Sequence, residues 1–122
     1  MAGTLAVALG GAAGSVLRYW ATLGAAWLGW GAFPWSTIAI NVAGSFAIGW
    51  FATAHGAASH EVRLLVMTGL CGGFTTFSAF SLQTLDLLRA GNLAGAAANV
   101  LLSVALCLAA VFAGHALAMR GA

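Results

Sequence analysis

Charged side chains are scarce in this sequence. Of its 122 residues, four are basic and two are acidic; every basic residue is an arginine, and lysine is absent. Soluble globular domains carry about 25% charged residues, whereas this chain carries 5%. So little charge cannot cover a surface that faces water. A net charge of +2 is also too small for the basic patch that binds nucleic acid. We therefore expect an integral membrane protein with no nucleic-acid partner.

Residues that carry covalent chemistry are equally few. The two cysteines, Cys71 and Cys107, both lie in apolar stretches. Such cysteines usually pack as small hydrophobic side chains, and we expect this in preference to a disulfide. The sequence has no metal-ligand spacing and no nucleophile–base pair, so an enzyme is not expected. The apolar N-terminal stretch has no basic segment before it and continues past Arg18, which indicates a retained span and not a cleaved signal peptide.

Hydrophobic residues, by contrast, make up 62% of the chain. They form four long stretches with short connections, and each stretch can cross the roughly 30 Å core of a bilayer. We expect a single all-α transmembrane domain over residues 1–122, with four helices, in the inner (plasma) membrane of the cell. The short connections make consecutive helices antiparallel neighbours. The expected helices cover residues 4–30, 35–54, 61–88 and 93–118, and the third is broken near 72–77.

The third stretch contains an unusual group of residues from Gly69 to Ser81, with the sequence GLCGGFTTFSAFS. Gly72 and Gly73 weaken a helix, and the hydroxyls that follow can bond backbone groups freed by a break. Irregular backbone at membrane depth survives only inside protein or beside a water-filled cavity, so this segment is a candidate site. Carbonyls would suit a hard cation such as Na⁺, whereas N–H groups and hydroxyls would suit an anion.

Two phenylalanines, Phe77 and Phe80, follow the glycines on one face of a helix. The edge of a phenyl ring carries partial positive charge, so a dehydrated anion could lie against both rings. Two ordinary core phenylalanines are the alternative. Asn41 also lies within a span, where its amide must be satisfied either by an interhelical hydrogen bond or by an ion in a pore.

Polar residues in the other spans each allow two interpretations. Arg18 could attract anions, or it could reach the membrane interface or pair with a polar group. Asn99, Ser103 and Cys107 are spaced four residues apart and form one stripe of the last helix. The stripe could line a polar path, or Ser103 could simply bond the carbonyl one turn before it.

Small residues recur at a spacing of four in the first three spans. This spacing lets membrane helices approach closely, and we expect packing and not chemistry at these positions. The pairs are Gly10 and Gly14, Ser45 and Gly49, and Gly69 and Gly73.

The arginines hardly distinguish the two sides of the membrane. With four spans, Arg63 and Arg120 face one side and Arg89 faces the other. Orientation follows the excess of Lys and Arg in short loops, so this small excess predicts no fixed orientation. Either other features set the orientation, or the protein inserts both ways and opposite copies pair as an antiparallel dimer. Four short helices leave little protein to shield an ion path, which also favours an oligomer.

Three segments carry an ordered set of motifs: GGAAGSVLRY at residues 10–19, NVAGSFAIG at 41–49 and GGFTTFSAF at 72–80. Together they resemble the Fluc (CrcB-like) family of fluoride channels, and the likeness covers essentially the whole chain. The resemblance implies passive, selective conduction of fluoride, which lowers cytoplasmic fluoride. It also implies a dual-topology antiparallel homodimer in the bilayer, with two pores.

The resemblance implies roles for individual residues as well. The backbone carbonyls of Gly72 and Thr75 would hold one structural Na⁺ at the dimer centre. Phe77 and Phe80 match the family's pore-lining pair. The rest of the fluoride pathway would comprise the pore asparagine Asn41, the hydroxyls of Ser78 and Ser103, and the vestibule arginine Arg18.

Four positions depart from the family's pattern. The family often has a carboxylate at the position of Gln83, a tyrosine at Asn99, a second serine at Cys107 and a threonine at Ala79. These departures leave open altered conduction, or a subunit that works with a second, different one.

Two other functions are open from the residues alone. A small multidrug exporter can also have four spans and dual topology, but proton-coupled export needs a titratable acid deep in the membrane. The acids here, Glu61 and Asp86, lie near expected helix ends. A non-conducting subunit of a larger membrane complex needs no ion site, and only the motifs argue against it.

Overall fold

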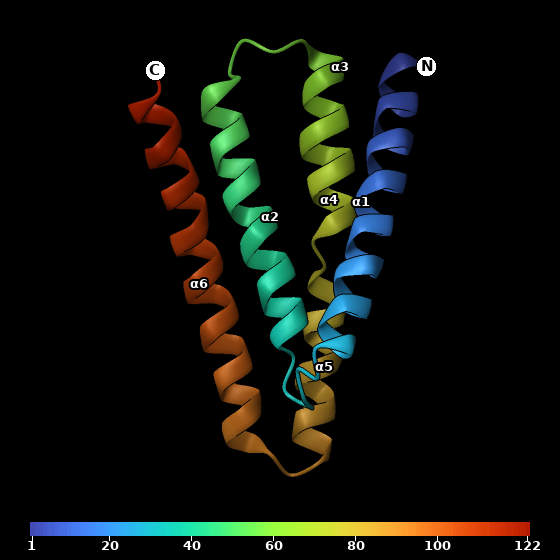
Figure 1. The fold of residues 1–122 in the computed structure, drawn as a ribbon, viewed down its shortest axis with the longest axis vertical. Coiled ribbons are helices and arrows are strands. Elements are labelled where there is room, and N and C mark those ends of the chain that lie inside the picture. Colours follow the sequence, from blue (N-terminus) through green and yellow to red (C-terminus); the bar gives the residue numbers. More distant parts are fainter.

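The computed structural model describes residues 1–122 and consists of helices and short connections (Figure 1). Four of the helical elements follow one another without a long connection, and we call this part, His60–Arg89, the third segment. The elements in order are α1 (Ala2–Trp27), α2 (Trp35–Ala54), α3 (His60–Arg63), η1 (Leu64–Cys71), α4 (Gly72–Phe74), α5 (Phe77–Arg89) and α6 (Leu93–Arg120).

Three parts of the chain are long and apolar enough to cross a membrane: α2, the third segment and α6. The remaining helix, α1, has 26 residues and packs along the third segment (Figure 1). Both chain termini lie at one end of the molecule, together with the connection from α2 to α3 (Figure 1). The expectation of an all-α protein of the membrane type is therefore confirmed.

Glycine and asparagine residues mark where the helices end. α1 ends at Trp27 and not near residue 30, because Gly29 takes a left-handed φ of 72° that a helix cannot continue. Gly91, with a φ of 77°, plays the same part after α5. The next residue, Asn92, accepts a hydrogen bond from the backbone N–H of Gly95 at 2.8 Å and so caps the first turn of α6.

Close contacts between helices run through the small residues. Gly10 and Gly14 of α1 are buried, and a Cβ atom at Gly14 would meet the backbone carbonyl of Leu70. From the other side, a Cβ atom at Gly69 would lie 2.9 Å from the Cα of Gly10. α2 and α6 approach each other in the same way at Gly49. At the glycines these contacts agree with the packing role that the spacing predicted, whereas Ser45 lines a groove between the helices.

The winding of the third segment changes along its length. Leu64–Cys71 forms a π-helix, whose wider turns nothing in the sequence pattern predicted. Helical winding then stops at Thr75 and Thr76, whose ψ angles of 158° and 115° are those of extended backbone. The Thr76 hydroxyl accepts a hydrogen bond from the N–H of Ala79 at 3.2 Å, which starts α5. The interruption lies inside the interval 72–77.

Few residues are buried within one chain. Only 18 of the 122 residues are buried, while large apolar side chains such as Leu101 and Phe112 are 69% exposed. So many exposed apolar side chains are unfavourable in water and favourable against lipid or another apolar protein surface. The surface thus agrees with the low charge of the sequence.

Candidate functional site

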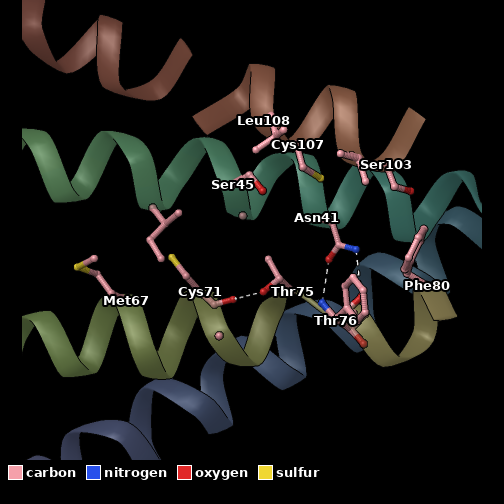
Figure 2. A pocket seen from close by; sticks show the side chains of 15 residues that line it. Asn41, Ser45, Met67, Cys71, Thr75, Thr76, Phe80, Ser103, Cys107 and Leu108 are labelled. Carbon is pink, nitrogen blue, oxygen red and sulfur yellow. Dashed lines mark hydrogen bonds between the residues drawn. The ribbon is translucent and has the colours of Figure 1, made fainter. Parts of the chain in front are cut away.

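A groove of about 420 Å³ lies between α2, the third segment and α6 (Figure 2). Its lining combines amide, hydroxyl, thiol and phenyl groups, and it contains no charged side chain. Fifteen residues line it. The groove brings together six of the residues that the sequence analysis placed in the ion sites: Asn41, Gly72, Thr75, Phe77, Phe80 and Ser103.

The amide of Asn41 holds the interruption of the third segment in place (Figure 2). Its Nδ2 donates to the carbonyl of Thr76 at 3.1 Å, and its Oδ1 accepts from the N–H of Thr76 at 2.8 Å. Both backbone groups of an extended residue are thereby satisfied at membrane depth, where an unmet group is costly. One N–H of the amide stays uncommitted. The interhelical bond and the pore role, which the sequence left as alternatives, are therefore compatible.

The interruption also changes which backbone oxygens are available. In a continuous helix the N–H of Thr76 would donate to the carbonyl of Gly72, but here it donates to Asn41. The Gly72 carbonyl thus loses the donor that a regular helix supplies. Thr75 turns both its N–H and its hydroxyl to the carbonyl of Cys71, at 3.0 and 2.9 Å. Both hydrogen-bond donors of Thr75 are therefore used locally. Thr75 itself has an extended ψ of 158°, so its carbonyl does not continue the direction of the helical carbonyls before it.

The two phenyl rings of the motif lie together at the start of α5. The ring centroids of Phe77 and Phe80 are 5.2 Å apart and the ring planes meet at 47°. Phe77 is 78% exposed on this chain, and Phe80 is half-buried. Tilted rings direct edges, and not only faces, into the space between them. Within one chain, Phe77 is therefore not part of the buried core.

Ser103 belongs to a small hydrogen-bonded network between α5 and α6. Its hydroxyl donates to Oδ1 of Asn99 at 3.3 Å, and Nδ2 of Asn99 donates to the hydroxyl of Thr84 at 3.0 Å. Thr84 in turn donates to the carbonyl of Phe80 at 2.8 Å. Asn99 is the most deeply buried large side chain, with no exposed surface. The sequence analysis identified the stripe on α6 but missed Thr84 as its partner on α5. The position of Thr84 one turn after Phe80 could have indicated this role.

Two residues expected on the fluoride pathway lie outside the groove. The exposed Ser78 has its hydroxyl 3.3 Å from that of Thr76. Arg18 lines a second cavity of about 350 Å³, which shares Thr76 with the groove. Gln83 lines this second cavity too, and its Oε1 is buried without a hydrogen-bond partner. The polar cavity around Arg18 and the uncharged groove are therefore neighbouring but distinct spaces.

Sulfur atoms form part of the lining that the sequence did not single out as a group. Met67, Cys71 and Cys107 all face the groove (Figure 2). Cys71 is buried, as expected for a small hydrophobic side chain, and Cys107 is half-buried; both are free thiols. Both acids are exposed and lie away from the groove, with Glu61 in the first turn of α3 and Asp86 near the end of α5. The titratable acid that a proton-coupled exporter needs is thus not part of this site.

Comparison with known proteins gives a consistent result. Residues 5–115 match the family described as CrcB-like protein, Camphor Resistance (CrcB). A relative from Methylocella silvestris is 50% identical over 118 residues, which cover 93% of this chain and 90% of the relative. One from Paramagnetospirillum magneticum is 54% identical over 114 residues, or 89% of each chain. One from Rhodospirillum rubrum is 51% identical over 117 residues, or 91% of this chain and 90% of the relative. All three are named fluoride-specific ion channel FluC.

Proposed function

This chain belongs to the CrcB-like family, and we propose that it is a fluoride-specific ion channel that conducts passively and lowers cytoplasmic fluoride. The observation that carries the proposal is the groove, which offers hydrogen-bond donors and phenyl edges but no charged side chain. A fixed cation in a narrow path would trap a small anion, whereas neutral donors let it leave. The names of relatives that share half of its residues identify the ion.

The proposed pathway replaces the water shell of fluoride one contact at a time. Asn41 can offer the one amide N–H that Thr76 does not use. The edges of Phe77 and Phe80 supply weak positive charge beside it. Ser103 lines the same groove from α6. Arg18 would act outside this path, because its guanidinium in the second cavity raises the concentration of anions nearby.

We also propose the structural Na⁺ that the family resemblance implies. Na⁺ is a hard cation that prefers oxygen ligands, as Mg²⁺ and Ca²⁺ do. The Gly72 carbonyl has lost its helical donor, and a Cβ at Gly72 would meet nothing closer than 3.8 Å, so the space beside it is open. The residues therefore fit such an ion. The carbonyls of Gly72 and Thr75 would hold it, and its charge would fix the irregular backbone and join two chains.

An antiparallel homodimer would complete both sites, and we propose this assembly. One chain offers two carbonyls, too few for a hard cation, and a second copy doubles the number. Phe77 is largely exposed on one chain, although it belongs to the proposed pathway. Arg63 and Arg120 stand near one end of the molecule and Arg89 near the other, so no strong charge bias opposes insertion both ways. In this proposal α1 is the fourth span, and the dimer lies in the inner membrane.

The function is tested with purified protein in liposomes loaded with KF. On addition of valinomycin, a fluoride electrode should record fast fluoride release, because K⁺ leaves through valinomycin and fluoride through the channel. Liposomes loaded with KCl should release chloride at the rate of protein-free liposomes. Equal release of the two ions would contradict selectivity. A folded protein that releases neither ion would instead support the non-conducting subunit.

A further inference from the structure

The network between α5 and α6 has a direction. Each polar group in it donates to the next, from Ser103 to Asn99, from Asn99 to Thr84, and from Thr84 to the carbonyl of Phe80. A serine hydroxyl has one hydrogen, and here that hydrogen points to Asn99. Ser103 lines the groove, whereas Asn99 and Thr84 do not. Toward the groove, Ser103 therefore presents lone pairs, which repel an anion.

The Asn99 side chain can reverse this direction without changing its shape. The oxygen and nitrogen of an amide are nearly equal in size, and a half-turn exchanges an acceptor for a donor. After the turn, Nδ2 of Asn99 would donate to Ser103, and Oδ1 would accept from the hydroxyl of Thr84. Thr84 would give up its bond to the Phe80 carbonyl, which keeps its helical partner. The hydroxyl hydrogen of Ser103 would then be free to point into the groove.

An anion in the groove decides which arrangement is favoured. Without an ion, the observed arrangement makes one more internal hydrogen bond and is preferred. With fluoride beside Ser103, the reversed arrangement gains a hydrogen bond to a charged acceptor, which is roughly twice as strong as a neutral one. A ligand shifts such a two-state equilibrium by its differential affinity for the two states. Chloride is a weaker hydrogen-bond acceptor than fluoride and gives a smaller shift.

We propose that Asn99 and Thr84 are positioning residues for fluoride. When the ion binds in the groove, the side-chain amide of Asn99 rotates by a half-turn, and the Ser103 hydroxyl then donates its hydrogen bond to the ion. This inference rests on the proposed function, because it takes fluoride as the ion in the groove. Neither residue touches the ion. Both act through Ser103. The Asn99 amide accepts a hydrogen bond from the Ser103 hydroxyl in one arrangement and donates to it in the other, and the Thr84 hydroxyl bonds the opposite atom of the amide in each case.

The orientation of the amide can be followed directly by NMR of the ¹⁵N-labelled full-length protein in lipid nanodiscs. The chain has three asparagines, and the Asn99 side-chain signal is identified by its loss in Asn99→Leu. Addition of NaF should shift this signal, equal NaCl should shift it much less, and Ser103→Ala should abolish the fluoride-dependent shift. The Asn92 side chain, which caps α6 at the exposed turn, is the internal control and should not move.

The outcomes separate this inference from the function on which it rests. If wild-type protein releases fluoride from liposomes but the Asn99 signal does not respond to fluoride, the reversal is refuted and the channel stands. If wild-type protein releases no fluoride, the proposed function fails first. A response that persists in Ser103→Ala also refutes the inference, because the amide would then be reporting something other than the serine.

A double-mutant cycle gives a second readout. Loss of one hydrogen bond to a charged group predicts that Ser103→Ala slows fluoride release by roughly tenfold. Asn99→Leu should slow it as well, because without the Asn99 Nδ2 donor the Ser103 hydroxyl bonds the backbone carbonyl one turn before it and no longer donates to the ion. If Asn99 acts only through Ser103, the double variant should be no slower than Ser103→Ala alone. Cys107→Ala is the matched control, because Cys107 lies one turn further on α6 and lines the groove outside the network. If Cys107→Ala slows fluoride release, the factor should multiply with that of Asn99→Leu when the two changes are combined. If the factors of Ser103→Ala and Asn99→Leu also multiply in their double variant, the proposal is overturned.

Discussion

At the scale of single residues, the site depends on a few polar groups with more than one task. The Asn41 amide forms hydrogen bonds to both backbone groups of Thr76, and it retains one N–H that can donate to an ion. The Thr75 hydroxyl donates its one hydrogen to the Cys71 carbonyl, so it cannot donate to an anion. Of the two side chains, only the asparagine therefore retains a hydrogen-bond donor for an anion.

The ring of Phe80 provides the sharpest residue-scale prediction. Phe80→Ile removes the phenyl edge beside Phe77 but keeps an apolar side chain of similar bulk. Because an aliphatic group has no positive edge, fluoride release from liposomes should fall by about tenfold or more. Phe112→Ile, at a ring that is 69% exposed on α6 and outside the groove, is the control and should conduct like wild type. Unchanged release by an intact Phe80→Ile dimer would remove this ring from the pathway.

At the scale of elements, close helix contacts position the interrupted third segment. α1 lies against η1 and α4 through glycines, and α2 reaches across to the interruption with Asn41. The sequence pattern indicated both the glycine contacts and the break. It did not indicate the π-helix of residues 64–71, because hydrophobic periodicity over so few residues does not separate α from π winding.

The glycine contacts predict opposite outcomes for two changes in the same helix. In Gly14→Ala the new Cβ would meet the Leu70 carbonyl, so α1 must move away from the third segment. Overpacking of this kind should lower the stability by about 1–3 kcal/mol. In Gly24→Ala the new methyl meets nothing within 4 Å and should leave stability unchanged or slightly higher. Denaturant titration in detergent compares the two; equal stability would show that the contact is not tight.

At the scale of the whole molecule, one chain leaves much of its apolar surface uncovered. Most of its large apolar side chains are exposed, and the proposed pathway includes the largely exposed Phe77. Two predictions address the proposed assembly, one on orientation and one on the ion between the copies.

Dual topology predicts labelling from both sides at both ends of the molecule. A single cysteine is placed at Gly121 or at Ala90, at opposite ends, in a Cys71→Ala/Cys107→Ala background. With insertion in both orientations, an impermeant thiol reagent should label about half of the chains of either variant in intact vesicles. Permeabilised vesicles, in which every chain is accessible, provide the control. Complete labelling of one variant and none of the other would establish a single orientation.

A structural Na⁺ predicts that stability depends on which cation is present. An ion that binds only the folded dimer stabilises it in proportion to the logarithm of its concentration over Kd, by about 2.7 kcal/mol at 100 times Kd. The melting temperature should therefore be higher in NaCl than in equal N-methylglucamine chloride. The step from LiCl to N-methylglucamine chloride controls for non-specific salt effects and should be smaller. If the melting temperature is the same in Na⁺ and in N-methylglucamine, the Gly72 and Thr75 carbonyls do not bind a stabilising Na⁺.

The sequence by itself determined the class of the protein and the place of its irregular backbone. Five per cent charge excludes a water-covered surface, and the glycines and threonines between residues 72 and 76 locate the break. Its motifs also led to the CrcB-like family, which the relatives confirm. These properties depend on composition and on residues close together in the chain, so they can be read from the sequence.

Only the tertiary structure decided which polar groups meet. Asn41 and Thr76 are 35 residues apart, and Thr84 and Asn99 are 15 apart on different helices. Periodicity assigns a residue to a face of its own helix, but it does not say which neighbour that face contacts. For the same reason, the placement of Arg18 in a second cavity follows from how the helices pack, and so does the orientation of the Asn99 amide, whose Nδ2 donates to Thr84 on α5.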